Sequence, residues 1–225
     1  NPIVGCSLHS PGCIHCYAMR QAHRLASNPA TPHYAGTTTT SKTGPVFTGT
    51  IARAPQHVLH APLKWRRPRR IFVNSMGDLF HESIPDEWID AVFAVMALAP
   101  QHVFQILTKR AARMHSYLQS ERVALTRRWG NVALAGGFLV HVLTDHSVSD
   151  ARQMNHELFE AITSRGGRLF RDGPPGGWPL PNVWLGVSAE RQQEADERIP
   201  HLLNTPAAVR FVAAEPLLGP IDFRA

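Results

Sequence analysis

The chain contains the run Arg70-Ile71-Phe72-Val73-Asn74-Ser75-Met76-Gly77-Asp78, in which β-branched and aromatic residues are followed at once by a polar cluster. The apolar part is typical of a buried strand. A helix is predicted next, because Pro85 opens an apolar stretch that continues to Met96. Two acids directly after this proline suit the positive end of the helix dipole. This strand and helix indicate an α/β fold.

The same alternation extends to both sides of this unit. Further strands are predicted at residues 1–5, 102–107, 182–187 and 209–213, and further helices at residues 16–26, through Met114 and Leu118, and at residues 191–203. Polar residues follow the strands where each one ends, and the carboxyl ends of parallel strands are where α/β proteins build their sites. We therefore expect one domain over residues 1–225, with its site on that rim.

Two segments have no clear pattern. Residues 27–70 are rich in Pro, Thr and Gly, and we expect them to form a covering loop region. Residues 119–181 are interpreted as an insertion within the domain, with a strand at residues 138–143 and a helix at residues 149–162. Neither segment is predicted to form a separate domain.

Composition limits the class of protein. Apolar residues make up 44% of the chain, enough for one core. No stretch is long and apolar enough to span a bilayer, and no signal peptide precedes the first cysteine, so we expect a cytoplasmic protein without a membrane partner. The net charge of +6 favours phosphate-bearing partners.

All the cysteines of the chain lie in the run Gly5-Cys6-Ser7-Leu8-His9-Ser10-Pro11-Gly12-Cys13-Ile14-His15-Cys16-Tyr17. Three crowded thiols favour a soft metal or an iron-sulfur centre in a reducing compartment over a disulfide framework. A structural zinc ion takes four protein ligands, whereas a four-iron cluster on three thiolates keeps one iron open. His9, His15 or His23 could supply a fourth zinc ligand, so iron-sulfur, zinc and unligated thiols remain alternatives on spacing alone.

Four further stretches accompany the cysteine run, and they are Ile71-Phe72-Val73-Asn74-Ser75-Met76-Gly77-Asp78-Leu79-Phe80-His81-Glu82, Phe104-Gln105-Ile106-Leu107-Thr108-Lys109-Arg110, Asn182-Val183-Trp184-Leu185-Gly186-Val187-Ser188 and Glu215-Pro216-Leu217-Leu218-Gly219-Pro220-Ile221. In this order they resemble a phage- and prophage-associated protein family of unknown function, which is itself similar to the radical S-adenosylmethionine (radical SAM) enzymes. The resemblance covers most of the chain except residues 119–181. Six residues separate Cys6 from Cys13, where most of that superfamily has three, and the two-residue gap before Cys16 matches.

The resemblance implies a partial TIM-like (β/α) barrel with parallel strands and outer helices, and a 4Fe-4S cluster on Cys6, Cys13 and Cys16. It also implies that S-adenosylmethionine chelates the open iron. One electron from a donor then cleaves it to a 5′-deoxyadenosyl radical, which takes hydrogen from a substrate. By their places at strand ends, the candidates for cofactor contact are Asn74, Ser75, Asp78, Ser188 and Glu190. The candidates for catalysis are Glu215, Lys109 and Arg110.

The cofactor candidates also have structural interpretations. Asp78 could cap a helix or a turn, and Ser188 with Glu190 fits a capping arrangement at the next helix. Both roles remain open for these residues.

The catalytic candidates have structural interpretations as well. Glu215 precedes Pro216 in an extended conformation and could pair with Arg210 rather than act as an acid. Lys109 and Arg110 open a helix, where the dipole disfavours cations, so we expect an anionic group beside them, either a phosphate or a carboxylate.

Basic residues alternate with tryptophan in the runs Lys64-Trp65-Arg66-Arg67-Pro68-Arg69-Arg70 and Arg127-Arg128-Trp129. Such runs can hold phosphates while a ring stacks on a base, although a solvated charged edge explains them equally well. A nucleic acid or nucleotide substrate is therefore a hypothesis. Besides the radical SAM-like enzyme, two other functions remain open: a zinc-stabilised nucleic-acid-binding module without catalysis, and a non-catalytic phage accessory protein.

Overall fold

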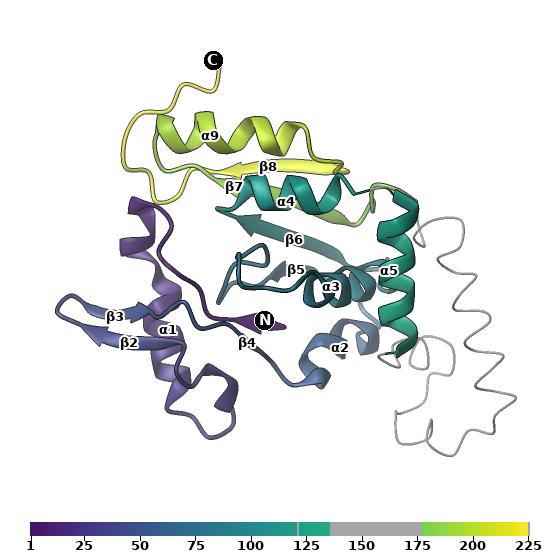
Figure 1. The fold of residues 1–225 in the computed structure, drawn as a ribbon, viewed down its shortest axis with the longest axis horizontal. Helices are drawn as coiled ribbons and strands as arrows, with labels where there is room; N and C mark the ends of the chain where they lie inside the picture. Colours follow the sequence, from purple (N-terminus) through teal and green to yellow (C-terminus); the bar gives the residue numbers. More distant parts are fainter. Residues whose placement is uncertain (121, 136–176, 225) are drawn as a thin grey trace, which may run out of the picture.

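A four-stranded parallel sheet forms the centre of the computed structural model, which describes residues 1–120, 122–135 and 177–224 (Figure 1). Its strand order is β5-β6-β7-β8, where the strands are β5 (Arg70–Val73), β6 (Val103–Thr108), β7 (Val183–Ser188) and β8 (Val209–Ala213). All three pairings in the sheet are parallel, so the predicted α/β class is confirmed. The described strands form an open sheet and no closed barrel.

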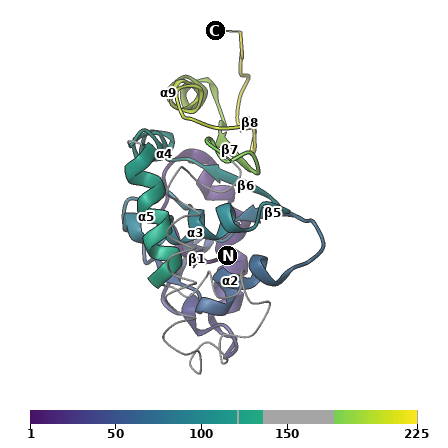
Figure 2. The ribbon, with the colours of Figure 1, turned by 90° about the vertical axis from the view of Figure 1, so that its right-hand side faces the viewer.

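One face of this sheet forms the main core. Val73, Ile106 and Leu185 are aligned across β5, β6 and β7, and all three are buried. The helices α4 (Ala111–Leu118), α5 (Arg122–Ala135) and α9 (Gln192–Leu203) lie on the same side of the strands (Figure 2). Of these helices, α4 and α9 were predicted after the strands β6 and β7, whereas α5 was not predicted.

The helix α3 (Asp86–Leu98) is the most deeply buried element of the core. It contacts α2 (Gln56–Lys64) and α5, and the rings of Phe93 and Trp129 stack with their centroids 5.0 Å apart. The segment 119–181, which we interpreted as an insertion, therefore contains a helix that packs in the core. The strand and helix predicted at residues 138–143 and 149–162 lie outside the described residues.

The N-terminal residues form a second layer beside the sheet. Its elements are β1 (Ile3–Val4), the 3-10 turn η1 (Pro11–His15), α1 (Tyr17–Ala26), the 3-10 turn η2 (Pro32–Tyr34), β2 (Thr38–Ser41), β3 (Gly44–Phe47) and β4 (Ala52–Arg53). The strands β2 and β3 form an antiparallel hairpin against α1, and β1 pairs with β4. Residues 27–70 therefore contain regular structure that the sequence pattern did not predict, because these elements are short and β2 is largely exposed.

The strand β1 joins this layer to the carboxyl end of β5. The Gly5 amide donates to the Met76 carbonyl at 3.0 Å, and the Ile3 amide donates to the side-chain oxygen of Asn74 at 3.4 Å. A Cβ atom on Gly77 would lie 2.7 Å from the Gly5 carbonyl oxygen, so this close approach requires glycine. The cysteine run therefore begins beside the end of β5.

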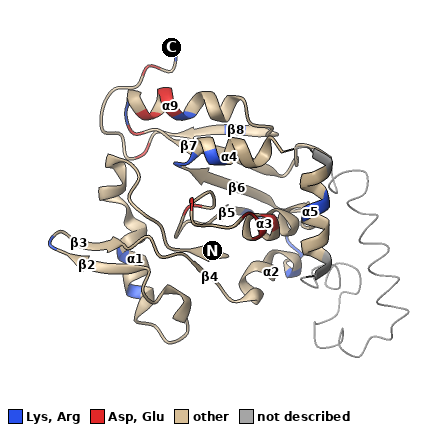
Figure 3. Ribbon diagram, in the orientation of Figure 1, with Lys and Arg blue, Asp and Glu red and all other residues tan. Residues whose placement is uncertain are grey.

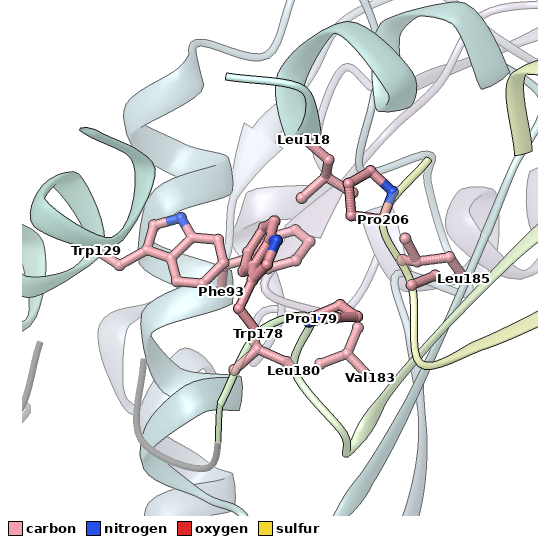
Figure 4. A pocket seen from close by; sticks show the side chains of 10 residues that line it. Phe93, Leu118, Trp129, Trp178, Pro179, Leu180, Val183, Leu185 and Pro206 are labelled. Carbon is pink, nitrogen blue, oxygen red and sulfur yellow. The ribbon is translucent and has the colours of Figure 1, made fainter. Parts of the chain in front are cut away.

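A pocket in the core, lined by Phe93, Trp129 and other mainly apolar side chains, is shown in Figure 4. Its volume is about 10 Å³, close to the minimum for one water molecule, so it is a packing gap and no ligand site. Within residues 1–120, 122–135 and 177–224, no helix combines the length and apolar character needed to cross a bilayer.

Candidate functional site

The three cysteines converge on one cavity. Cys13 is buried in η1, Cys6 and Cys16 are half-buried on either side of it, and all three are free thiols. They line a cavity of about 450 Å³ at the carboxyl end of the sheet, a size suited to a small ligand. Other residues of this wall are Phe72, Asn74, Ser75, Asp78, Leu107, Lys109, Arg110, Ser188 and Glu215. The sequence prediction that cysteines and strand ends form one site is thus matched by a shared cavity.

Asp78 and Arg110 form the first of two ion-pair networks on this rim. The Arg110 guanidinium donates from Nη1 to Asp78 at 3.1 Å and from Nε to Glu82 at 2.8 Å. Asp78 also accepts from the Thr108 hydroxyl at 2.6 Å and from the backbone amides of Phe80 and Lys109, both at 3.0 Å. Protein donors thus engage both oxygens of Asp78, which favours its structural role over contact with a cofactor.

The same network holds the beginning of the cysteine loop. Arg110 donates from Nη2 to the Ser7 hydroxyl at 2.9 Å, and its Nη1 lies 3.8 Å from the Cys6 sulfur. Ser7 also lies 2.8 Å from Nε2 of His81. The anionic neighbour that we expected beside Arg110 is therefore a pair of protein carboxylates, and the arginine connects the ends of β5 and β6 to the loop.

Glu190 forms the second network. Its side chain is fully buried, and it accepts from the Ser10 hydroxyl at 2.6 Å and from Arg198 at 2.9 Å. It also forms an ion pair with Lys109. A Cβ atom on Gly12 would lie 2.6 Å from its carboxylate oxygen, so the loop packs directly on this residue. Glu190 is not among the described residues that line the cavity, and its contacts favour a structural role in holding the loop.

Asn74 lines this cavity and has a buried amide nitrogen without a partner among the described residues. Its φ of 57° is in the left-handed region, which asparagine tolerates and which ends β5. Its side-chain oxygen accepts from Ile3, whereas no described residue hydrogen-bonds to its buried Nδ2. A buried donor without a partner is unfavourable by about 1–3 kcal/mol, so an acceptor on a bound ligand would stabilise this arrangement. Ser188 is likewise buried on the cavity wall.

The environments of the thiols differ. Burial, reinforced by the Asp78 charge, raises the pKa of Cys6 to about 12. Burial also raises the pKa of Cys16. Burial alone would raise the pKa of Cys13, but backbone hydrogen bonds from His9 and Ser10 and the Lys109 charge outweigh it and lower that pKa.

The three histidines considered as zinc ligands occupy different places. His15 lines the cavity with the thiols, while His9 lines a separate pocket of about 220 Å³ with Arg113 and His201. His23 lies on α1 and its Nδ1 is 3.1 Å from the Thr38 hydroxyl. Within the described part of the chain, no group of three or more His, Cys, Asp or Glu side chains is arranged to hold one metal ion.

Glu215 lines the cavity from the segment after β8 and is exposed. The pairing with Arg210 that we considered is wrong: the Arg210 guanidinium donates instead to the carbonyls of Leu202 at 3.0 Å and Thr205 at 2.7 Å. Both carbonyls lie at the carboxyl end of α9, and a cation that binds the last carbonyls of a helix stabilises that helix. The structure places Glu215 in the site but gives it no structural partner there among the described residues.

The two basic runs lie away from the cavity. The run from Lys64 to Arg70 precedes β5 and is therefore at the opposite end of that strand from the thiols. The Trp65 ring is covered by the Arg69 guanidinium, 4.4 Å from its centroid. In the second run Arg127 is exposed, but Trp129 is fully buried and Arg128 is bound to Asp90 at 2.9 Å, so the ring of this run cannot stack on a base.

Sequence reasoning missed Ser7, Ser10 and Arg198, which hold the loop. Serines in a loop carry no strong signal by themselves. Arg198 does carry a sequence signal. It lies on α9 at helical spacing from Ala195 and Leu202, so the apolar face of this helix includes a cation, and a cation on a buried face needs an anionic partner.

Comparison with known proteins gives one match. A family model described as "Protein of unknown function (DUF5131)" matches residues 1–225. No curated protein matches, and no solved structure matches. Because the family model covers the whole length, the chain belongs to the family DUF5131.

Proposed function

We propose that this protein is a radical SAM-like iron-sulfur enzyme, in which Cys6, Cys13 and Cys16 hold a 4Fe-4S cluster beside a site for S-adenosylmethionine. One observation carries the proposal: three free thiols line a ligand-sized cavity together with Asn74, whose buried amide nitrogen has no partner among the described residues. Three thiols on one loop fit a cluster with one open iron. When bound, the cluster and S-adenosylmethionine supply one-electron chemistry that no side chain of this protein can provide.

The donor set favours a cluster over a zinc ion. Thiolates on a single zinc ion lie about 2.3 Å from it, so their sulfur atoms must be close together. Thiolates of a cluster bind separate irons and stand farther apart. Only one of the three histidines considered as a fourth zinc ligand shares the cavity with the thiols, whereas a cluster on three thiolates needs no histidine.

The protein's own residues would bind and orient the cofactor. The Nδ2 of Asn74 can donate to its carboxylate, and the Ser188 hydroxyl and exposed Glu215 lie on the same wall for further polar contacts. Phe72 and Leu107 supply apolar surface against which the adenine can pack and from which water is excluded. The sheet that carries these residues is open and parallel, which is compatible with the α/β class, and the partial barrel implied by the resemblance is part of the proposal.

The test is anaerobic reconstitution with iron and sulfide, followed by metal analysis and electron paramagnetic resonance of the reduced protein. We expect about four irons per chain, and formation of 5′-deoxyadenosine from S-adenosylmethionine under reduction. Replacing any of the three cysteines with alanine should remove both.

His15→Ala is the matched control, because among the described residues His15 is the histidine that lines the cavity with the thiols. We expect this variant to retain the iron. Stoichiometric zinc that is lost in His15→Ala, without iron in the parent, would overturn the proposal and favour the zinc-stabilised module.

A further inference from the structure

Charge is distributed unevenly along this chain. Residues 1–77 contain none of its 17 acidic side chains and nine of its 23 basic ones. In Figure 3, the ribbon of α1 and the β2–β3 hairpin carries basic residues and no acidic ones. The layer that carries the cysteine loop therefore presents a positive surface, although the net charge of the whole chain is only +6.

A groove of about 760 Å³ runs between α1 and the β2–β3 hairpin. Arg20 and Arg24 line it from α1, where side chains four apart share a helix face, and both are exposed. Ser41 and Thr43 line it from the hairpin. None of the described residues in its lining is Asp or Glu, so the groove is suited to an anion.

The groove leads into the cysteine cavity. Leu8, His15, Cys16 and Tyr17 line both spaces. Tyr17 is 66% exposed, and its hydroxyl donates to the Ser75 carbonyl at 3.3 Å, which holds the ring at the junction. An elongated anion in the groove would therefore extend past an exposed aromatic ring to the thiols.

We propose that this groove binds a single-stranded nucleic acid, with phosphates on Arg20 and Arg24 and a base stacked on Tyr17. Basic side chains beside an exposed aromatic ring are the combination that holds single strands, because the ring needs an unpaired base. The Thr43 hydroxyl can donate to a phosphate oxygen, whereas the Ser41 hydroxyl donates to the Gly44 carbonyl at 2.7 Å and shapes the hairpin. The inference that this nucleic acid is the substrate rests on the proposed function, whereas the inference that the groove binds it does not.

This location differs from the basic run that the sequence suggested. The run from Lys64 to Arg70 lies at the amino end of β5, so a strand held there would not approach the thiols. The groove at α1, in contrast, combines cations, an exposed ring and a path to the cavity.

The test measures binding of short fluorescein-labelled single strands of DNA and RNA by anisotropy at rising salt. Each phosphate contact on a single strand contributes about 0.7 to the slope of log K against log salt, so the double variant Arg20→Ala/Arg24→Ala should lower that slope by about 1.4. Tyr17→Ala should weaken binding by about 5- to 150-fold. The matched control, Arg67→Ala/Arg70→Ala, removes the same charge from the exposed basic run and should change the slope much less.

Three results would overturn this proposal: no salt-dependent binding, an equal loss of slope in the control, or equal affinity for polyglutamate of the same charge. Duplexes should bind more weakly than single strands. Iron content and 5′-deoxyadenosine formation are measured on the same variants. If the parent protein binds no iron and forms no 5′-deoxyadenosine while nucleic-acid binding still depends on Arg20 and Arg24, the proposed enzymatic function is wrong and the proposed binding groove is supported.

Discussion

Glu190→Gln distinguishes a residue that holds the loop from one that contacts a ligand. The substitution keeps the size of the side chain and removes its charge. Glu190 is fully buried and pairs with Lys109 and with Arg198, whose side chain is 2% exposed. Removal of the carboxylate leaves at least one cation buried without an anion.

The expected loss of stability is large. Breaking a buried ion pair from one side costs about 3–5 kcal/mol, because the remaining charge is desolvated without compensation. For a chain of this length, each kcal/mol corresponds to about 2–4 °C in the midpoint of thermal unfolding, so the midpoint should fall by about 6–20 °C. The Ser10 hydroxyl, which donates to Glu190 at 2.6 Å, would keep only a weaker neutral acceptor.

The assay is thermal unfolding followed by far-ultraviolet circular dichroism on the protein without added metal. Glu87→Gln serves as the control, because this carboxylate is exposed in the first turn of α3 and should contribute only about 0.3–1 kcal/mol. A midpoint for Glu190→Gln within the range of the control would refute this reasoning. If that variant also bound S-adenosylmethionine poorly, Glu190 would be a cofactor contact, as its position at a strand end first suggested.

Three further substitutions test other parts of the structure. Gly12→Ala should cost about 1–3 kcal/mol by overpacking against Glu190, whereas Gly219→Ala, whose added Cβ would have its nearest neighbour at 3.9 Å, should melt like the parent. Trp129→Ala should lower the free energy of unfolding in urea by about 3–5 kcal/mol, because the ring is fully buried, and should leave the salt slope of strand binding unchanged. A changed slope would instead identify the second basic run as an interface. Asn74→Asp keeps the acceptor for Ile3 and loses the donor, so calorimetry on the reconstituted protein should give an affinity for S-adenosylmethionine about 10- to 100-fold lower at unchanged iron content. Equal affinity would remove Asn74 from the site.

The sequence predicted the elements of the central sheet well, because β5, β6 and β7 are apolar runs bounded by polar clusters. It also predicted that their ends and the cysteines meet, although β1 reaches the end of β5 through the contact of Gly5 with Met76 and Gly77 and is not a strand of the parallel sheet. It did not distinguish Asp78 and Glu190 as ion-pair partners from ligand contacts. That distinction depends on which cations from other elements, Arg110 and Arg198, reach the same point, and spacing along one strand contains no such information.

The wide spacing of the first two cysteines has a structural explanation. Of the six residues between Cys6 and Cys13, Ser7 is bound by Arg110, and Ser10 is bound by Glu190. The additional length is therefore attached to the rim at two points, one at Arg110 and one at Glu190. Because both attachment points are charged networks fixed by strand ends, the loop has a defined position despite its length, as a site that binds a cofactor through three thiols requires.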